Sequence, residues 1–138
     1  MTVFTTNAKW TEKFQFEATG SSGHAILVDG DGQIASSPME LVLAALCGCT
    51  GYDVVNILEK KREPFTAVEV IAKADKASQP PRVYTEIEVL YRVRGTVSQK
   101  AVEDAVRLSE ERYCSVSAML GKVAKISYRI ELDEIEAR

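Results

Sequence analysis

The sequence predicts an α+β fold built as a single domain over residues 1–138. Three observations support this prediction. Segments with two-residue apolar alternation occur near both ends and in the middle of the chain, and segments with helical periodicity separate them. The order is strands, helix, strands, helix and strand, which is typical of α+β rather than α/β proteins. A chain of 138 residues is the size of one domain and can bury roughly two-thirds of its unfolded surface without staples.

The N-terminal segment, residues 3 to 29, is expected to form strands that open the fold as a hairpin or small sheet. Phe14 and Phe16 alternate with polar neighbours, and HisAlaIleLeuValAsp at 24–29 follows a ThrGlySerSerGly turn. Alternation followed by a turn and a second apolar run is typical of paired strands.

A long helix is predicted to run from Pro38 to about Arg62. Ser37 fits the N-cap, Pro38 the first helical position and Glu40 the position that completes a capping box. The last turn is basic, which suits the negative end of the helix dipole, and Pro64 ends the helix.

This helix would be about 37 Å long at about 1.5 Å per residue, and its first four turns are apolar or small on every side. One small sheet covers only one side of such a helix. Either a second helix or a partner subunit must cover the rest, and we favour a homodimer.

The second half of the chain is expected to continue with a hairpin, a helix and a final strand. AlaValGluValIleAlaLysAla is followed by a loop at 75–81 and by a strand at 83–93 with one polar face. Ser98 can cap an amphipathic helix, a short apolar turn at 116–120 follows Cys114, and residues 126–132 alternate as a last strand.

Composition excludes several classes of partner. A formal net charge of −3 with scattered basic residues gives no electrostatic footprint for nucleic acid. The N-terminus lacks the pattern of a signal peptide, and the longest weakly polar run, Leu41–Tyr52, is shorter than the roughly 20 residues of a membrane span. A cytoplasmic protein without membrane contact is expected, and there its three cysteines would be free thiols, ligands or redox groups.

Cys47 and Cys49 cannot share a helix face, because two helical positions differ by about 200°. A zinc site would need three or four ligands, and His24 is the only histidine, so no metal is expected. Either helical cysteine taken alone could be a small buried apolar residue. Asp53 lies one turn beyond Cys49 and would disfavour its thiolate. Cys114 opens a predicted helix, where backbone N–H groups could stabilise a thiolate.

Two motifs resemble the OsmC/Ohr family, the osmotically inducible and organic hydroperoxide resistance proteins. SerProMetGluLeuValLeuAlaAlaLeuCysGlyCys at 37–49 has a proline opening a long helix and a cysteine eleven residues after it. GluArgTyrCysSerValSer at 111–117 resembles the second-cysteine motif. GlyHis near 24 and SerAlaMetLeuGlyLys near the end are similar to the YhfA-type branch.

The resemblance implies an intertwined homodimer with long central helices and no flavin, haem or metal cofactor. It implies that Cys49 is the peroxide-reactive thiol and Cys114 the resolving thiol. The first thiolate attacks the O–O bond of an organic hydroperoxide, and the resulting sulfenic acid condenses with the second thiol to a disulfide that an external thiol reduces. These are the features of a peroxiredoxin-type peroxidase of the oxidative stress response.

The sequence departs from the family at the groups that activate the thiolate. Where the family has a Glu after the helix-opening proline this chain has Met39, and Leu27 lies about where the family's Arg is expected. Glu40 is displaced by one residue, about 100° of helix, so a capping role is expected for it. His24 is the other candidate supporting residue, although an unperturbed histidine is mostly neutral at pH 7.

Three functions remain open from the sequence. The first is a peroxidase acting on organic hydroperoxides, weak because the Arg and Glu are missing. The second is a non-catalytic or redox-sensitive dimer that binds an apolar or acyl ligand in an interface pocket. The third is a purely structural dimer with buried cysteines, since a fold does not by itself transfer an activity.

Overall fold

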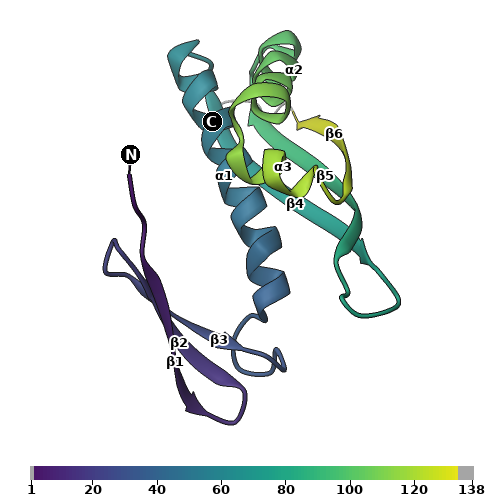
Figure 1. The fold of residues 1–138 in the computed structure, drawn as a ribbon. Coiled ribbons are helices and arrows are strands. Elements are labelled where there is room, and N and C mark those ends of the chain that lie inside the picture. Colours follow the sequence, from purple (N-terminus) through teal and green to yellow (C-terminus); the bar gives the residue numbers. More distant parts are fainter. Residues whose placement is uncertain (1, 134–138) are drawn as a thin grey trace. The chain divides into compact units, whose positions relative to one another are not determined.

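The computed structural model describes residues 2–133 and contains two compact units that divide after Leu43 (Figure 1). Each unit carries one three-stranded sheet. The long helix α1, Pro38–Lys60, begins in the first unit and continues into the second. Sheets and helices occur in the predicted order, so the α+β prediction is confirmed.

The first unit is an antiparallel sheet in the order β1-β2-β3. A third strand therefore extends the expected hairpin. Phe14, expected within a strand, lies instead in the turn that joins the first two strands. The strands are β1 (Thr6–Glu12), β2 (Gln15–Gly20) and β3 (Ala25–Asp29).

The capping box of α1 is present as predicted. The Glu40 backbone N–H donates to Ser37 Oγ at 3.2 Å, and the Ser37 N–H donates to the Glu40 carboxylate at 3.1 Å. These hydrogen bonds lower the pKa of Glu40. The helix ends at Lys60, two residues before the predicted end, and Arg62 has a left-handed φ of 56°.

The second unit is built on a sheet in the order β4-β5-β6, with β4 antiparallel and β6 parallel to the central strand. Four alternating side chains of the central strand are fully or almost fully buried, as the alternation predicted. The strands are β4 (Phe65–Lys76), β5 (Tyr84–Gly95) and β6 (Lys125–Asp133), and the buried residues are Ile87, Val89, Tyr91 and Val93.

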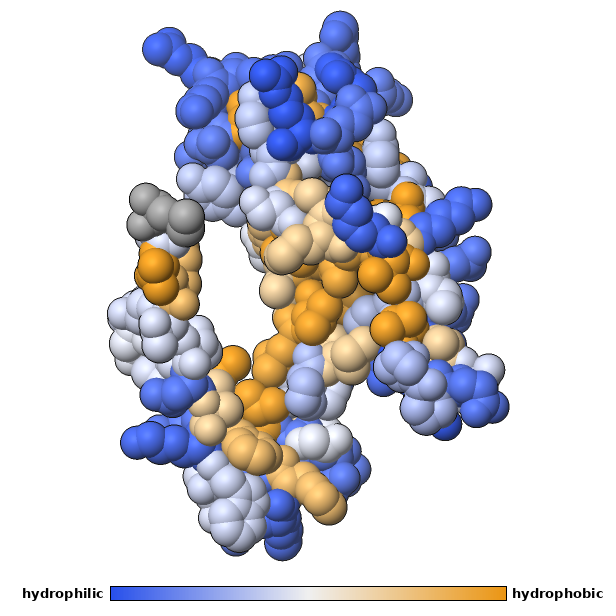
Figure 2. All heavy atoms as spheres, viewed as in Figure 1, coloured by the Kyte–Doolittle hydropathy of each residue, from blue (hydrophilic) through white to orange (hydrophobic). Residues whose placement is uncertain are grey.

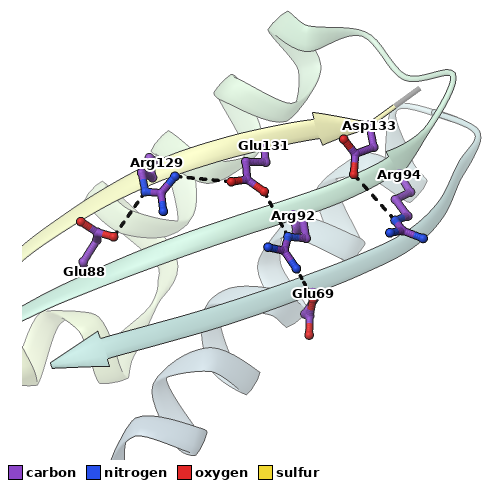
Figure 3. Close-up of polar contacts among 7 residues, drawn as sticks. All are labelled: Glu69, Glu88, Arg92, Arg94, Arg129, Glu131 and Asp133. Carbon is purple, nitrogen blue, oxygen red and sulfur yellow. Dashed lines mark hydrogen bonds and ion pairs between the residues drawn. The ribbon is translucent and has the colours of Figure 1, made fainter. Parts of the chain in front are cut away.

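The opposite face of this sheet carries a ladder of ion pairs across all three strands (Figure 3). Arg92 reaches Glu131 at 3.1 Å and Glu69 at 3.4 Å. Arg129 continues the ladder to Glu88 at 3.3 Å. These side chains are largely exposed, and such pairs contribute at most about 1 kcal/mol each. The ladder therefore marks the solvent face, while the helices lie behind the other face.

Helix α1 buries only a narrow stripe in the second unit, made of Leu46, Thr50, Val54 and Leu58 at four-residue spacing. Tyr52, on another side, is 70% exposed. By length and composition α1 is apolar enough to cross a membrane, a test that the core helix of a soluble protein also passes. Figure 2 shows apolar side chains gathered over this part of the molecule. The uncovered apolar surface is what the homodimer prediction requires, and the homodimer stays a prediction.

A second helical layer follows β5. Helix α2 (Gln99–Leu108) leads directly into η1 (Ser109–Tyr113), a single π-helical turn, and then into α3 (Ser115–Leu120). The sequence did not predict the π-helical turn. Ser98 caps α2 as expected, because its Oγ accepts a hydrogen bond from the Ala101 N–H at 3.2 Å.

Replacement of Ser98 by Ala should destabilise the protein by about 1 kcal/mol, because one N–H of the first turn of α2 loses its partner. Urea unfolding measures the change. Ser98→Asp is the matched control, since an aspartate can accept the same hydrogen bond and should leave the midpoint nearly unchanged. Equal losses in both variants would contradict the capping role.

Candidate thiol site

The thiols of Cys49 and Cys114 lie within hydrogen-bonding contact of each other. Cys49 comes from the middle of α1 and is half-buried, whereas Cys114 lies between η1 and α3 and is only 3% exposed. The packing of these helices thus brings together two residues that lie far apart in the sequence of the second unit.

The π-helical turn and the start of α3 fix the position of Cys114. Its backbone N–H donates to the Ser109 carbonyl, five residues earlier, at 2.8 Å. Its sulfur is the N-cap of α3 and accepts a hydrogen bond from the Ser117 N–H at 3.3 Å. The predicted contact between this sulfur and a helix N-terminus is therefore present.

That contact does not make Cys114 an acidic thiol, contrary to the sequence-based expectation. Burial raises its pKa, and the neighbouring Cys49 and Asp53 act in the same direction. The Ser117 N–H opposes them but is outweighed. Loss of hydration penalises a thiolate more than one weak N–H···S bond stabilises it. Cys114 is therefore held as a neutral thiol.

A buried hydrogen-bond network lies beside the thiols. The Thr50 hydroxyl on α1 contacts the Tyr91 hydroxyl on β5 and, at 2.7 Å, the Ser109 hydroxyl. Ser109 also donates to Asp53 at 2.8 Å, and Tyr91 donates to Glu110. Among the described residues, no buried side-chain nitrogen or oxygen lacks a partner.

Of this network, only Asp53 was predicted from the sequence as a candidate residue. Its members sit at positions where periodicity predicts burial: Thr50 lies midway between Leu46 and Val54, and Tyr91 lies on the apolar face of β5. The signal in the sequence was a polar residue at a position where the apolar periodicity predicts burial. Such a residue points to a network, because a buried hydroxyl group requires a hydrogen-bonding partner.

Cys47 lies away from the thiol pair. It is half-buried, its sulfur contacts the backbone of Ala72 on β4, and burial raises its pKa. This agrees with the helical geometry, which separated Cys47 from Cys49 by about 200°. Cys47 therefore serves as packing against the sheet.

The structure gives the two other candidate supporting residues local roles in the first unit. His24 is exposed, and its Nδ1 lies 3.1 Å from Ser22 Oγ. Glu40 is engaged in the capping box of α1.

Two basic residues of the second unit, Arg82 and Arg112, are exposed. The guanidinium of Arg112 lies 5.8 Å from the centre of the Tyr113 ring, and Arg82 lies in the loop between β4 and β5. Within residues 2–133, the interactions that dominate the ionisation of Cys114 include no cation.

A cavity of about 450 Å³ borders the Asp53 end of the network. Its wall consists of apolar groups, one cation and one amide. Asp53 is the residue of the hydrogen-bond network that lines this cavity. The lining residues are Asp53, Asn56, Ile57, Lys60, Leu108 and Tyr113. Over residues 2–133, no group of three or more His, Cys, Asp and Glu side chains is arranged to hold a metal ion.

A family model described as OsmC-like protein matches residues 30–129. The chain belongs to the OsmC family. Protein YhfA of Escherichia coli strain K12 is 42% identical over 126 residues, covering 90% of this chain and 94% of YhfA. The resemblance to the OsmC/Ohr family is therefore confirmed, with a YhfA protein among the relatives.

Solved structures share the fold. A crystal structure from Aquifex aeolicus VF5 is 33% identical with a TM-score of 0.91, covering 99% of this chain and all of the other. The organic hydroperoxide resistance protein OhrB of Bacillus subtilis is 14% identical with a TM-score of 0.62, covering 94% and 98% of the two chains. The first is a sequence relative, whereas the second shows the fold alone.

The raised pKa of Cys114 predicts slow alkylation of this thiol at neutral pH. The thiolate is the reactive form, and each unit by which a pKa rises removes roughly nine-tenths of it. In a Cys47→Ser, Cys49→Ser protein, Cys114 should react with iodoacetamide at least about tenfold more slowly than a free thiol, with the rate rising at alkaline pH. A rate equal to that of free cysteine in the folded protein would contradict the burial effect.

Proposed function

We propose that this protein is a thiol-dependent peroxidase that reduces organic hydroperoxides through Cys49 and Cys114. The observation that carries the proposal is the contact between the two thiols. Membership of the OsmC family and the fold shared with organic hydroperoxide resistance proteins support it.

The proposed reaction has two steps. The Cys49 thiolate attacks the peroxide, forming an S–O bond and breaking the O–O bond, so that Cys49 becomes a sulfenic acid and the hydroperoxide an alcohol. Cys114 then displaces hydroxide from the Cys49 sulfur to form a disulfide and water. The side chains of Cys49 and Cys114 already interact, so the two sulfurs begin this second step close together. An external thiol reduces the disulfide.

Turnover should be slow. Met39 stands where the family resemblance implies a Glu, and Leu27 lies about where it implies the activating Arg. The acidic groups of the described network are Asp53 and Glu110, and an ionised carboxylate disfavours a neighbouring thiolate. The rate of peroxide consumption should therefore rise as the pH is raised above neutrality.

We further propose that the protein is a cytoplasmic homodimer in which a second copy covers the apolar surface of α1. The second unit also exposes large apolar side chains on α1, η1, α3 and the segment after α3. They are Tyr52, Tyr113, Met119 and Val123. Sedimentation equilibrium should give twice the monomer mass.

The direct test is consumption of cumene hydroperoxide with dithiothreitol as reductant, compared with hydrogen peroxide as substrate. We expect slow consumption of cumene hydroperoxide that exceeds the rate without protein. No consumption across neutral and alkaline pH, together with no disulfide after peroxide treatment, would refute the peroxidase.

A second candidate function is the binding of an apolar or acyl ligand at the dimer interface, with the thiols as redox-sensitive neighbours. The uncovered apolar side chains and the neutral state of Cys114 favour it. Native mass spectrometry of the purified protein should then show a bound lipid or acyl compound. An empty protein that consumes hydroperoxide would argue against this alternative.

A further inference from the structure

A continuous chain of three hydroxyl groups links two carboxylates inside the second unit. Ser109 Oγ lies 2.8 Å from Asp53 Oδ2 and 2.7 Å from Thr50 Oγ1. Thr50 Oγ1 lies 2.5 Å from the Tyr91 hydroxyl, which contacts the Glu110 carboxylate. We call these five groups the hydroxyl chain. They come from α1, β5 and the π-helical turn η1.

The hydroxyl chain is closed to water along its middle. Thr50, Tyr91 and Ser109 are each 0% exposed. Burial, followed by the bond to Glu110, raises the pKa of Tyr91, so its phenol keeps its proton. The three hydroxyl groups therefore have to satisfy one another and the two carboxylates.

The number of hydrogen atoms does not match the number of contacts. Four contacts join the five groups, but Ser109, Thr50 and Tyr91 supply one hydroxyl hydrogen each. If both carboxylates were ionised, one buried oxygen pair would face each other without a hydrogen, which is costly in a dry interior. We propose that Asp53 and Glu110 share one additional proton through the hydroxyl chain.

With this proton, two arrangements satisfy every contact. In one, protonated Asp53 donates to Ser109 and each hydroxyl donates onward until Tyr91 donates to ionised Glu110. In the other, protonated Glu110 starts the sequence and Ser109 donates to ionised Asp53. Changing one arrangement into the other carries the proton from one end to the other without moving a heavy atom.

Both ends of the hydroxyl chain lie beside the thiol pair. Asp53 is one helical turn beyond Cys49, and its charge acts on Cys114. At the other end, the second oxygen of Glu110 accepts from the Ser117 hydroxyl at 3.2 Å. The backbone N–H of the same serine donates to the Cys114 sulfur.

Across residues 2–133, neither Asp53 nor Glu110 forms a salt bridge. Lys60 is the basic residue in the wall of the cavity that Asp53 borders. From β6, the Tyr128 ring packs edge-on against Tyr91, with 6.3 Å between the ring centres. A shared proton would remove one of these two negative charges.

The role of the shared proton in catalysis rests on the proposed function. The ionised end accepts the proton of the Cys49 thiol; the thiolate then forms the S–O bond as the O–O bond breaks, and the departing alkoxide takes the proton as an alcohol. In the second step the Cys114 thiol proton leaves with the hydroxide as water. Atoms and electrons balance, because the hydroperoxide is the oxidant and the two thiols are the reductant. In this sequence of steps the hydroxyl chain takes up the thiol proton and returns it to the leaving group.

Infrared spectroscopy of the reduced protein tests the proposal without any peroxide. Solvated carboxylates are ionised at neutral pH, so the shared proton should give a carbonyl band of a protonated carboxylic acid that shifts in D₂O. Thr50→Val should abolish this band, because the interrupted chain leaves Ser109 and Tyr91 to donate to two ionised carboxylates. Thr50→Ser keeps the hydroxyl and should keep the band.

Asp53→Asn and Glu110→Gln locate the proton. Either amide can donate into the hydroxyl chain, so each substitution should remove the band. Absence of the band in the unmodified protein, or its persistence in folded Thr50→Val, would overturn the proposal, with circular dichroism as the check of folding. Because this readout does not involve hydroperoxide, a band in a protein without peroxidase activity would refute the function but not the shared proton.

Discussion

Replacement of Cys49 by Ser should lower the rate of cumene hydroperoxide consumption to the rate measured without protein, because removal of a nucleophile leaves only background chemistry. Serine preserves the size of the side chain, so packing around the half-buried position should change little. The measurement is the initial rate with dithiothreitol in excess, at the pH where the unmodified protein is fastest.

Two further variants separate the roles of the three cysteines. Cys114→Ser should still reduce one equivalent of hydroperoxide, but a sulfenic acid should accumulate at Cys49 and trap with dimedone. Cys47→Ser is the matched control, because Cys47 packs against β4 away from the thiol pair, and it should keep the full rate. Full activity in Cys49→Ser would show that another thiol reacts with the peroxide.

Replacement of Leu46 by Ala should destabilise the protein by about 2–5 kcal/mol, because the truncation leaves a cavity under α1. Leu46 is 0% exposed and lies on the stripe by which α1 packs in the second unit. Thermal or urea unfolding at fixed protein concentration measures the loss.

Glu59→Ala is the control for that stability measurement. Glu59 lies on the same helix but is exposed near its C-terminal end, so its replacement should change stability by no more than about 0.5 kcal/mol. A loss below about 1 kcal/mol for Leu46→Ala would mean that α1 is not held by its buried stripe.

The sequence was sufficient for features that depend on local chemistry. The capping box of α1 at Ser37 and Glu40, the N-cap at Ser98 and the alternation from Ile87 to Val93 are all present. Each is determined by residues a few positions apart. Tertiary packing reinforced the preference of these residues for their local structure.

Features that depend on packing could not be predicted in the same way. The parallel pairing of β6 with β5, and the π-helical turn that places Cys114, involve partners far apart in the sequence. The ionisation of Cys114 was predicted in the wrong direction, because the helix N-terminus was visible in the sequence and the burial was not. The hydroxyl chain combines residues from positions 50 to 110, and only Asp53 was singled out in advance.

The contact between Cys49 and Cys114 also required the structure. The family resemblance implied the pairing, but helical geometry alone assigned the two cysteines of α1 only to different sides. Their environment in turn changes the expected chemistry. The thiol pair lies beside two carboxylates and a chain of hydroxyl groups. Proton transfer, rather than a neighbouring cation, is therefore expected to activate the reactive thiol.

The central claim is that Cys49 and Cys114 form a disulfide when the protein reduces a hydroperoxide. Its most direct test is peptide mapping by mass spectrometry after one equivalent of cumene hydroperoxide is added to the reduced protein and free thiols are alkylated. The account predicts one cross-linked species that joins the peptides of Cys49 and Cys114, with Cys47 alkylated. A disulfide that includes Cys47, or Cys49 and Cys114 both recovered as alkylated thiols, would contradict it.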